Sequence, residues 1–377
     1  MELTAQALEL KLTEPFRIAR SVQYYAHNVL TQIEVDGIVG VGEAAPSGYY
    51  GEKRESVLMA LSYFTDHLGD DPTLIEDVMA GLDRVMQGNA AAKAAIDMAL
   101  YDIVGKRLGV PVYQLLGLNP GRAPHTSFTI GMDTPIEMAK RALVARDYPI
   151  LKIKLGGKHD LDIIKAIRDV TNAVIRVDAN AAWTPKEAIR SINALEPYDI
   201  EFVEQPLPPK DLAGLRLVRE NVSLPIIVDE SCVTLEDIPL IIGCADGINI
   251  KLMKCGGIHH ALKMIHAARA HHLRVMLGCM IESSLAITAA AHLSPLVDYA
   301  DLDGMLLVDD DPFDGVQVKD GKLMLPDRPG LGVRRRDGKR KLPARAVDAT
   351  PAALPARTAT RAKGAQRDTE GEIEYEE

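Results

Sequence analysis

The central part of the chain alternates short β-branched runs with amphipathic segments of helical length, and this alternation constrains the fold more than any other feature. A parallel sheet built from repeated strand–helix units has this pattern, because each helix carries the chain back to the starting edge of the sheet. Between about residues 123 and 304 the candidate strands are HTSFTIG, ILKIKLG, AVIRVDA, IEFVEQ, PIIVDES, GINIKL, LRVMLGC and VDYADLD. Eight strands favour a closed (β/α)8 TIM barrel, with seven strands and an open edge as the alternative.

Two of the intervening helices carry explicit start signals. Residues 134–137 read Thr-Pro-Ile-Glu, and Thr184, Pro185 and Glu187 repeat this arrangement. A threonine N-cap, a proline at the first helical position and an acid at the third satisfy the free backbone donors of a helix start. We therefore expect helices to begin at residues 135 and 185.

Polar side chains recur where the candidate strands end. The last polar residues of successive runs are Lys154, Asp178, Glu204, Asp229, Lys251, Cys279 and Asp301, spaced 22 to 28 residues apart. Each step is about one strand–helix unit, and barrel enzymes place catalytic groups at the C-terminal ends of strands, so these residues should converge on one mouth. A single such residue is explained as a helix cap or a solvated rim residue. Six ionisable groups in the same register indicate a site.

The chemistry of this series points to a metal. Asp178, Glu204 and Asp229 come from three consecutive strands and offer hard oxygen ligands without an accompanying His or Cys set. Such ligands suit Mg²⁺ rather than Zn²⁺. Lys154 and Lys251 would flank the metal from opposite sides of the barrel.

In the run ILKIKLGG, Lys152 and Lys154 project from the same face of a strand, because side chains alternate along it. A lysine has a reference pKa of about 10.4, and enzymes lower it toward about 7–8 by burial and neighbouring charge when the lysine is a base. We expect Lys154 to be a candidate base, and Lys152 to tune it while binding a substrate anion. A lysine pair that only neutralises the acidic cluster is the structural alternative.

Composition limits the setting of the protein. The chain has 377 residues and a net charge of −10, which argues against a nucleic-acid partner. The start lacks the basic and apolar segments of a signal peptide, and no apolar run reaches membrane-spanning length, so we expect a cytoplasmic protein without a membrane partner. The four cysteines form no CxxC pair and are expected to be reduced thiols. A homo-oligomer stays open, because the sequence does not fix the oligomeric state.

From Arg334 onward the composition changes. This segment is rich in Ala, Pro, Thr and charged residues and nearly lacks large apolar side chains. It cannot bury enough apolar surface to repay the entropy of ordering. We expect residues 334–377 to form a disordered tail.

Five short motifs together resemble those of the enolase superfamily, muconate lactonizing enzyme subgroup. They are KIK at 152–154, DAN at 178–180, EQP at 204–206, DES at 229–231 and KLMKCGG at 251–257. They occur in the expected order and on the expected strands, and the resemblance covers nearly the whole chain apart from the tail.

The resemblance implies a modified (β/α)8 barrel with an α+β capping domain. Residues 119–304 would form the barrel, and residues 1–118 with 305–333 would form the capping domain. In the first of these segments, ALELKLTEPF, NVLTQIEVDG and VGVGEAAP read as antiparallel strands, followed by helical runs.

The resemblance also implies a mechanism that agrees with the chemistry of the strand ends. Mg²⁺ held by Asp178, Glu204 and Asp229 would bind a substrate carboxylate and stabilise the enediolate formed when the α-proton leaves. A base on each face of the α-carbon, Lys154 on one side and Lys251 on the other, would permit epimerisation.

The stretch YADLDGM narrows the substrate. Asp301 and Asp303 alternate about one residue, so both should face the mouth and form a second anionic site suited to an ammonium group. This DxD resembles the dipeptide epimerases, in which it binds the free α-ammonium group of the substrate. The same resemblance implies substrate contacts at Thr129 and at Cys279, Met280 and Ile281. The alternative is that both aspartates cap a following turn.

The expected function is therefore Mg²⁺-dependent epimerisation of a dipeptide, L-Ala-D/L-Glu or a related L,L-dipeptide, at the α-carbon of its C-terminal residue. Arg20 resembles the arginine that recognises the glutamate side chain in L-Ala-D/L-Glu epimerases, in a loop that is one residue longer here. An N-acylamino acid racemase, an o-succinylbenzoate synthase or a muconate-type cycloisomerase would share the lysines and carboxylates without needing an ammonium site. A nonenzymatic binding protein would need neither metal ligands nor paired lysines.

Overall fold

The computed structural model describes residues 1–336. The tail expected at 334–377 lies outside the described residues, apart from its first three positions. Of these, Arg334–Arg335 form strand β15, which pairs antiparallel with β12 (Phe313–Asp314). Arg336 adds an ion pair to Asp314, so the ordered chain extends past the expected start of the tail.

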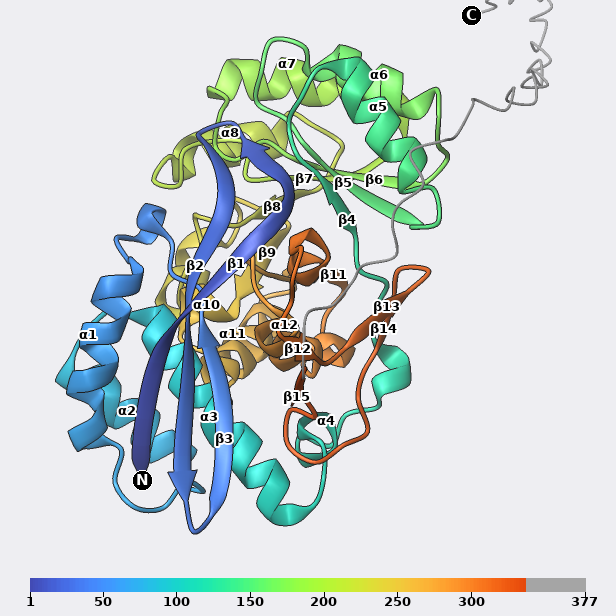
Figure 1. Ribbon diagram of the computed structural model, residues 1–377. Helices are drawn as coiled ribbons and strands as arrows, with labels where there is room; N and C mark the ends of the chain where they lie inside the picture. The colour runs from blue at the N-terminus through green and yellow to red at the C-terminus, as the bar shows by residue number, and fades with distance from the viewer. Residues whose placement is uncertain (337–377) are drawn as a thin grey trace, which may run out of the picture. The chain divides into compact units, whose positions relative to one another are not determined.

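The expected barrel is confirmed. Within residues 1–336 one sheet has eight parallel strands, in which strands that follow one another in the sequence are hydrogen-bonded neighbours (Figure 1). They are β4 (Phe128–Ile130), β5 (Ile150–Lys154), β6 (Val174–Asp178), β7 (Ile200–Glu204), β8 (Ile226–Val228), β9 (Gly247–Lys251), β10 (Arg274–Gly278) and β11 (Tyr299–Asp301). Thr126, two residues before β4, forms an isolated bridge with Ala300 of β11, so the eight-stranded barrel is nearly closed and the alternative of seven strands with an open edge is wrong.

Helices separate the strands of the barrel and cover its outside. They are α5 (Pro135–Val144), α6 (Asp160–Arg168), α7 (Pro185–Leu195), α8 (Leu212–Glu220), α9 (Ile238–Ile241), α10 (Leu252–Cys255), α11 (Ile258–Ala270) and α12 (Ser284–Ala291). Both start signals are confirmed. The side chain of Thr134 accepts a hydrogen bond from the backbone of Glu137, and Thr184 forms a capping box with Glu187.

The N-terminal segment forms an antiparallel sheet covered by helices. Its strands are β1 (Glu2–Ile18), β2 (Ser21–Val35) and β3 (Ile38–Ala44), and its helices are α1 (Arg54–Phe64), α2 (Ile75–Val85), α3 (Ala90–Leu108) and α4 (Val112–Leu115). Helix α3 is buried over most of its length, because β2 and β3 cover one side and the barrel helix α11 and the short α10 approach another. Helix α3 therefore packs between the capping sheet and the barrel helices.

Short elements complete the structure. The remaining strands are β13 (Gln317–Lys319) and β14 (Lys322–Met324). The 3-10 turns are η1 (Gly48–Tyr50), η2 (Thr65–His67), η3 (Pro120–Arg122), η4 (Glu196–Tyr198), η5 (Leu235–Asp237), η6 (Ser294–Leu296) and η7 (Gly304–Leu307). No helix within residues 1–336 is long and apolar enough to cross a membrane.

After the barrel the chain returns to the N-terminal segment. Asp309 donates its backbone N–H to Lys11 in β1 at 2.8 Å, and Leu331 donates to the side chain of Asp102 in α3 at 2.8 Å. These contacts support the proposed assignment of residues 305–333 to the capping domain.

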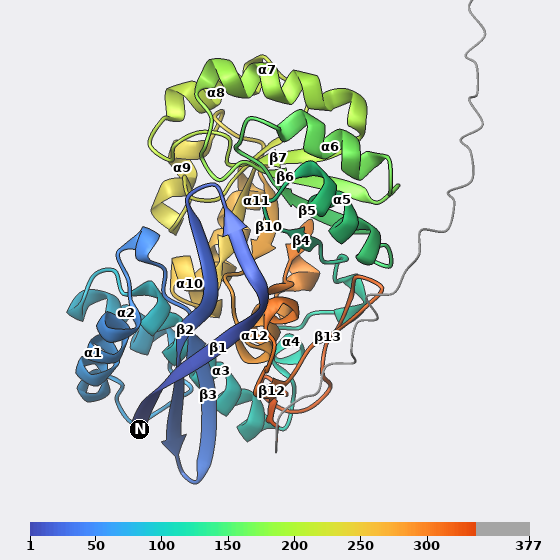
Figure 2. The ribbon, with the colours of Figure 1, turned by 45° about the horizontal axis from the view of Figure 1, so that its top comes forward.

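The β1–β2 hairpin extends from the capping sheet over the barrel (Figures 1 and 2). Its far end is fixed to the loop after β4, where Met132 donates its backbone N–H to the carbonyl oxygen of Arg17 at 2.9 Å. The hairpin turn at residues 19 and 20 therefore lies above the C-terminal ends of the strands, where the sequence places the candidate site.

Gly42 of β3 lies against helix α3, and this contact leaves no room for a side chain. A Cβ atom at Gly42 would overlap the backbone oxygen of Ala95. We expect Gly42→Ala to lower the free energy of unfolding by about 1–3 kcal/mol, the usual cost of overpacking a core. Urea denaturation in the presence of EDTA measures the change.

Gly81→Ala in α2 is the matched control, because the nearest atom to a Cβ at Gly81 is Arg84 Nη2 at 4.0 Å. Alanine is favoured over glycine within a helix by about 1 kcal/mol, so this variant should unfold at a higher urea concentration than the wild type. A Gly42→Ala protein with the wild-type midpoint would contradict the packing argument.

Candidate active site

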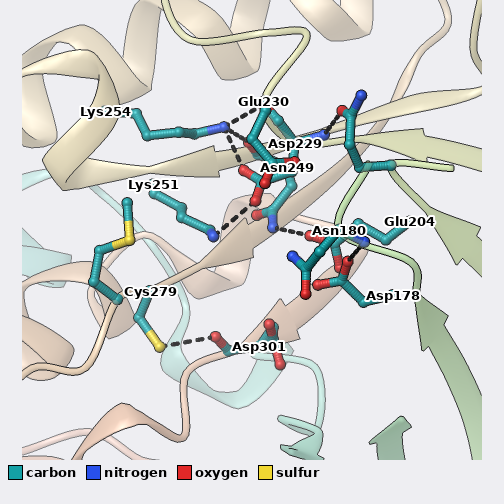
Figure 3. Close-up of polar contacts among 12 residues, drawn as sticks. Asp178, Asn180, Glu204, Asp229, Glu230, Asn249, Lys251, Lys254, Cys279 and Asp301 are labelled. Carbon is teal, nitrogen blue, oxygen red and sulfur yellow. Dashed lines mark hydrogen bonds and ion pairs between the residues drawn. The ribbon is translucent and has the colours of Figure 1, made fainter. Parts of the chain in front are cut away.

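The strand ends converge as the spacing predicts. Lys154 ends β5, Asp178 ends β6, Glu204 ends β7, Asp229 follows β8 and Lys251 ends β9. Figure 3 shows the last four of these residues. Parallel register explains this convergence, since Lys154 is the partner of Asp178, and Asp178 is the partner of Glu204 across adjacent strands. The three carboxylates are almost completely buried, with exposed fractions of 0–2%.

Lys152 lies at the centre of the acidic groups. Its Nζ atom is 2.6 Å from Glu204 Oε2, 2.6 Å from Asp301 Oδ2 and 3.2 Å from Asp178 Oδ2. Lys154 Nζ lies 2.6 Å from the same Asp178 oxygen, so the two lysines share one face of β5 as expected. Burial alone lowers the pKa of Lys152, but the charges of Asp301, Glu204 and Asp178 outweigh it and hold the pKa well above its usual value.

The opposite side of the mouth is held by a second pair of lysines. Lys251 Nζ is 2.8 Å from Asp229 Oδ2, and Lys254 Nζ is 2.6 Å from Asp229 Oδ1. Burial and Lys152 both lower the pKa of Lys251, but the charge of Asp229 outweighs both and raises that pKa above its ordinary value.

The three carboxylates differ in how their lysine partners act on them. Burial raises the pKa of Asp178, but Lys154 and Lys152 outweigh it and lower the value to about 2. Lys251 and Lys254 outweigh burial at Asp229 and lower its pKa further below the ordinary value. Burial and the charge of Asp178 raise the pKa of Glu204 to about 7. Glu204 is therefore the carboxylate that most lacks positive charge.

The donor set fits a hard divalent cation. The three carboxylates do not point at one common centre: across residues 1–336, no group of three or more His, Cys, Asp and Glu side chains is arranged to hold a metal ion. Each of the three carboxylates turns an oxygen toward a lysine ammonium group instead. Among the described residues, Glu204 Oε2 is buried without a hydrogen-bond partner, although Lys152 lies at ion-pair distance. Three buried carboxylates with hard oxygens and no imidazole or thiolate suit Mg²⁺.

Asp301 and Asp303 are both buried, and they are not equivalent. Asp301 binds Lys152 through Oδ2 and accepts a hydrogen bond from Ser127 Oγ at 2.6 Å through Oδ1. Asp303 Oδ2 accepts from the backbone N–H of Thr129 at 2.6 Å. Burial raises the pKa of Asp301, but Lys152 outweighs it and lowers the value. Burial and the charge of Asp301 raise the pKa of Asp303 to about 7.

A cavity of about 430 Å³ opens above these groups. Of the residues expected from the sequence, its walls include Arg20, Thr129, Lys152, Lys154, Lys251, Cys279, Met280, Ile281, Asp301 and Asp303. Asp178, Glu204 and Asp229 lie behind the lysines and do not line it. The volume is that of a site for a small molecule.

Arg20 reaches into the cavity from the turn of the β1–β2 hairpin. Its guanidinium group donates to Glu230 Oε1 at 2.7 Å and to the carbonyl oxygen of Asn180 at 3.2 Å. The same group lies over the ring of Tyr49, 4.2 Å from the centroid. Arg20 therefore joins the hairpin and η1 of the capping segment to the loops after β6 and β8.

Sequence reasoning missed several groups that hold the site together. Asn249 donates to Glu204 Oε1 at 2.8 Å, and its position two residues before Lys251 on one strand face was an available signal. Gln205 Oε1 accepts from the backbone N–H groups of Asp229 and Ser231, which fixes the loop after β8. Lys254 stands in the quoted motif KLMKCGG, but no sequence pattern distinguishes its contacts from those of a surface lysine.

Comparison with known proteins agrees with this geometry. Residues 1–117 match the family described as mandelate racemase / muconate lactonizing enzyme, N-terminal domain, and residues 136–339 match the family described as enolase C-terminal domain-like. The chain is 43% identical over 320 residues to a Bacteroides thetaiotaomicron protein described as L-Ala-D/L-Glu epimerase, covering 84% of each chain.

Solved structures are similar over the same range. A dipeptide epimerase from Enterococcus faecalis, complexed with Mg and the dipeptide L-Leu-L-Tyr, is 38% identical with a TM-score of 0.84 over 88% of this chain and 98% of that one. An N-succinyl Arg/Lys racemase from Bacillus cereus is 32% identical with a TM-score of 0.85 over 89% and 96%. The resemblance inferred from the motifs is thus confirmed, and the chain belongs to the enolase superfamily, in its mandelate racemase and muconate lactonizing enzyme group, and is an enzyme.

Proposed function

We propose that this enzyme epimerises a dipeptide at the α-carbon of its C-terminal residue by moving a proton from one face to the other. One observation carries the proposal. Lys154 on β5 and Lys251 on β9 line the same cavity from strands four places apart in the ring of eight described strands, and the same cavity holds Asp301 and Asp303. Two opposed bases serve inversion at carbon, and a pair of acids serves a free ammonium group.

The proton transfer is assigned to the two lysines. Lys154 would remove the α-proton from one face of the substrate and Lys251 would return a proton to the other, with an enediolate between the two steps. When bound by Asp178, Glu204 and Asp229, Mg²⁺ would supply positive charge that offsets these carboxylates and the charge developing on the substrate carboxylate.

Lys152 would hold the substrate carboxylate in place. Its ammonium group stays charged beside its acidic partners, because they hold its pKa well above the usual value. A fixed positive charge aimed at a developing oxyanion lowers the barrier to α-proton loss.

The substrate ammonium group is assigned chiefly to Asp303. Asp301 already has a lysine partner, whereas among residues 1–336 Asp303 has no Lys or Arg within ion-pair distance. A charged ammonium group entering the cavity would therefore gain most from the uncompensated acid. An N-acylated amino acid offers no such charge, so this difference favours a dipeptide over an N-succinyl amino acid.

The side chain of the second residue is assigned to the wall made by the capping segment. Arg20 and Tyr49 form part of that wall. Relatives described with an acidic second residue, L-Ala-D/L-Glu, and with an aromatic one, L-Leu-L-Tyr, are both similar to this chain. Within residues 1–336 the guanidinium group of Arg20 makes two hydrogen bonds, whereas such a group has five N–H donors to offer. We therefore include L-Ala-L-Glu and L-Ala-L-Leu among the substrates to be compared.

Removal of metal tests the carboxylate site. We expect EDTA to abolish epimerisation and Mg²⁺ or Mn²⁺ to restore it, because the buried carboxylates would otherwise stay paired with the lysines. Mg²⁺ at about a hundred times its dissociation constant should also stabilise the fold by about 2.7 kcal/mol, measured by urea denaturation. Full activity in thoroughly chelated protein would contradict the metal-dependent mechanism.

Replacement of each lysine tests the two-base scheme. We expect Lys154→Ala and Lys251→Ala each to lower the epimerisation rate by about 10²–10⁴-fold, the usual contribution of a general base. In deuterated water each variant should still exchange the α-proton of the stereoisomer that faces its remaining lysine, which mass spectrometry measures. Lys158→Ala, which removes an exposed lysine four residues from Lys154, is the control and should behave as the wild type. Near wild-type epimerisation by either catalytic variant would refute the scheme.

The two aspartates should respond differently to neutralisation. A hydrogen bond to a charged group is worth about 1.5–3 kcal/mol, so Asp303→Asn should lower kcat/KM for a dipeptide by about ten- to a hundredfold and leave N-succinyl amino acids unaffected. Asp301→Asn also removes a partner of Lys152, so it should slow both substrate classes.

The measurement is kcat/KM of both variants on L-Ala-L-Glu, L-Ala-L-Leu and N-succinyl amino acids. An unchanged kcat/KM for dipeptides in Asp303→Asn would contradict the assignment of Asp303 to the substrate ammonium group. A wild type that prefers succinylated compounds would favour an N-acylamino acid racemase instead.

A further inference from the structure

Lys254 on helix α10 is an unusual residue for the interior of a barrel. Its side chain has an exposed fraction of 0%, yet its ammonium group is enclosed by oxygen atoms. Among the described residues Nζ donates to Asp229 Oδ1 at 2.6 Å and to three carbonyl oxygens, those of Asp229 at 2.6 Å, Asn249 at 2.8 Å and Cys232 at 2.9 Å. Figure 3 shows Lys254 beside Asp229. Burying an ammonium ion is costly unless every donor finds an acceptor, and this enclosure meets that condition.

The oxygens around Lys254 belong to the loop after β8, which carries the proposed metal ligand Asp229, and to strand β9, which ends at Lys251. Asp229 is itself such a ligand, and Cys232 lies in the loop that follows it. Asn249 lies on β9 and uses its side chain to donate to Glu204 Oε1 at 2.8 Å. Lys254 therefore fixes one ligand directly and contacts the residue that fixes another.

The two oxygens of Asp229 are divided between two lysines. Lys254 binds Oδ1 from inside the protein, whereas Lys251, on the cavity wall, binds Oδ2. A carboxylate held at one oxygen cannot rotate freely, so the other oxygen is kept toward the cavity. Lys251 immediately precedes the one-turn helix α10, which carries Lys254. The oxygens that enclose Lys254 therefore also fix the backbone position of Lys251.

We propose that Lys254 is a positioning residue that orients Asp229 for the metal and holds the start of helix α10 so that Lys251 faces the substrate. The proposal rests on the proposed function, since it concerns the same metal ligand and the same base. Lys254 does not line the cavity and acts only through Asp229 and Lys251.

Charge and position predict opposite results when Lys254 is replaced. By Coulomb's law alone, removing a positive charge next to a carboxylate would strengthen the binding of a cation. Removing the group that orients the carboxylate would weaken it. The sign of the change in metal affinity therefore separates a positioning residue from a bystander charge.

The experiment compares Lys254→Met with Lys93→Met. Methionine keeps the length of the apolar stem and removes the charge. Lys93 on α3 is the matched control, because its side chain is also nearly buried and pairs with Asp83 at 2.7 Å, outside the site. We expect Lys254→Met to bind Mg²⁺ about tenfold or more weakly by titration calorimetry, which is about 1.4 kcal/mol, and Lys93→Met to bind as the wild type does.

A second readout does not depend on metal affinity. At saturating Mg²⁺, α-proton exchange into each stereoisomer of the dipeptide reports separately on the two faces. Lys254→Met should slow exchange on the face assigned to Lys251 more than on the face assigned to Lys154. A residue that served only the stability of the fold would slow both faces alike.

The outcomes separate the inference from the proposed function. Failure of the wild type to bind Mg²⁺ would overturn the proposed function. A folded Lys254→Met protein that binds Mg²⁺ as tightly as the wild type, or more tightly, with an unchanged ratio of exchange rates, would overturn the role of Lys254.

Lys254→Arg keeps the test decisive if the methionine variant does not fold. Arginine retains the charge but carries it on a planar fork that does not match an enclosure built for a point charge. We expect this variant to show weaker Mg²⁺ binding and the same skewed exchange ratio. Wild-type affinity and ratio in Lys254→Arg would show that charge alone suffices and would overturn the proposal.

Discussion

Buried carboxylates of like charge can share one barrel mouth only when buried cations stand between them, and the rest of this structure follows from that pairing. Asp178, Glu204 and Asp301 converge on Lys152, with N···O distances of 2.6–3.2 Å. On the other side Asp229 is bound by a lysine at each oxygen. Without these lysines the strands would bring uncompensated charge into a site from which water is largely excluded, at a cost of several kcal/mol per ion.

The barrel supplies the geometry that this pairing needs. Inward positions alternate along each strand, so Phe202 and Ile227, two residues before Glu204 and Asp229, belong to a buried layer beneath the charges. Arg176, two residues before Asp178, is also buried and lies over the ring of Phe202. The capping segment supplies the roof, where Arg20 bonds to Glu230 across 210 positions of the sequence.

Much of this site could be predicted from the sequence, because a regular fold converts spacing into position. The 22 to 28 residue interval between polar strand ends places Asp178, Glu204 and Asp229 together once the strands are known to be parallel. The pKa of Lys251 could not be predicted, since it is a difference between burial and the charge of Asp229 at 2.8 Å. The contacts of Lys254 were hidden for a related reason, because three of its acceptors are backbone carbonyl oxygens, which every residue carries.

Lys152 connects the two halves of the cavity, and this connection explains why Asp301 and Asp303 differ in their charged partners. Its ammonium group bonds to Glu204 among the proposed metal ligands and to Asp301 in the proposed ammonium site. Asp301 therefore belongs to both halves, and its charge is partly offset by a lysine that it shares with Glu204 and Asp178. Asp303 stands two residues further along the chain and, within residues 1–336, has no Lys or Arg at ion-pair distance, so in the proposed function it is left for a ligand to balance. In the proposed function, one strand end would thus provide a structural acid and a recognition acid, and the difference between them is that Lys152 of β5 pairs with Asp301.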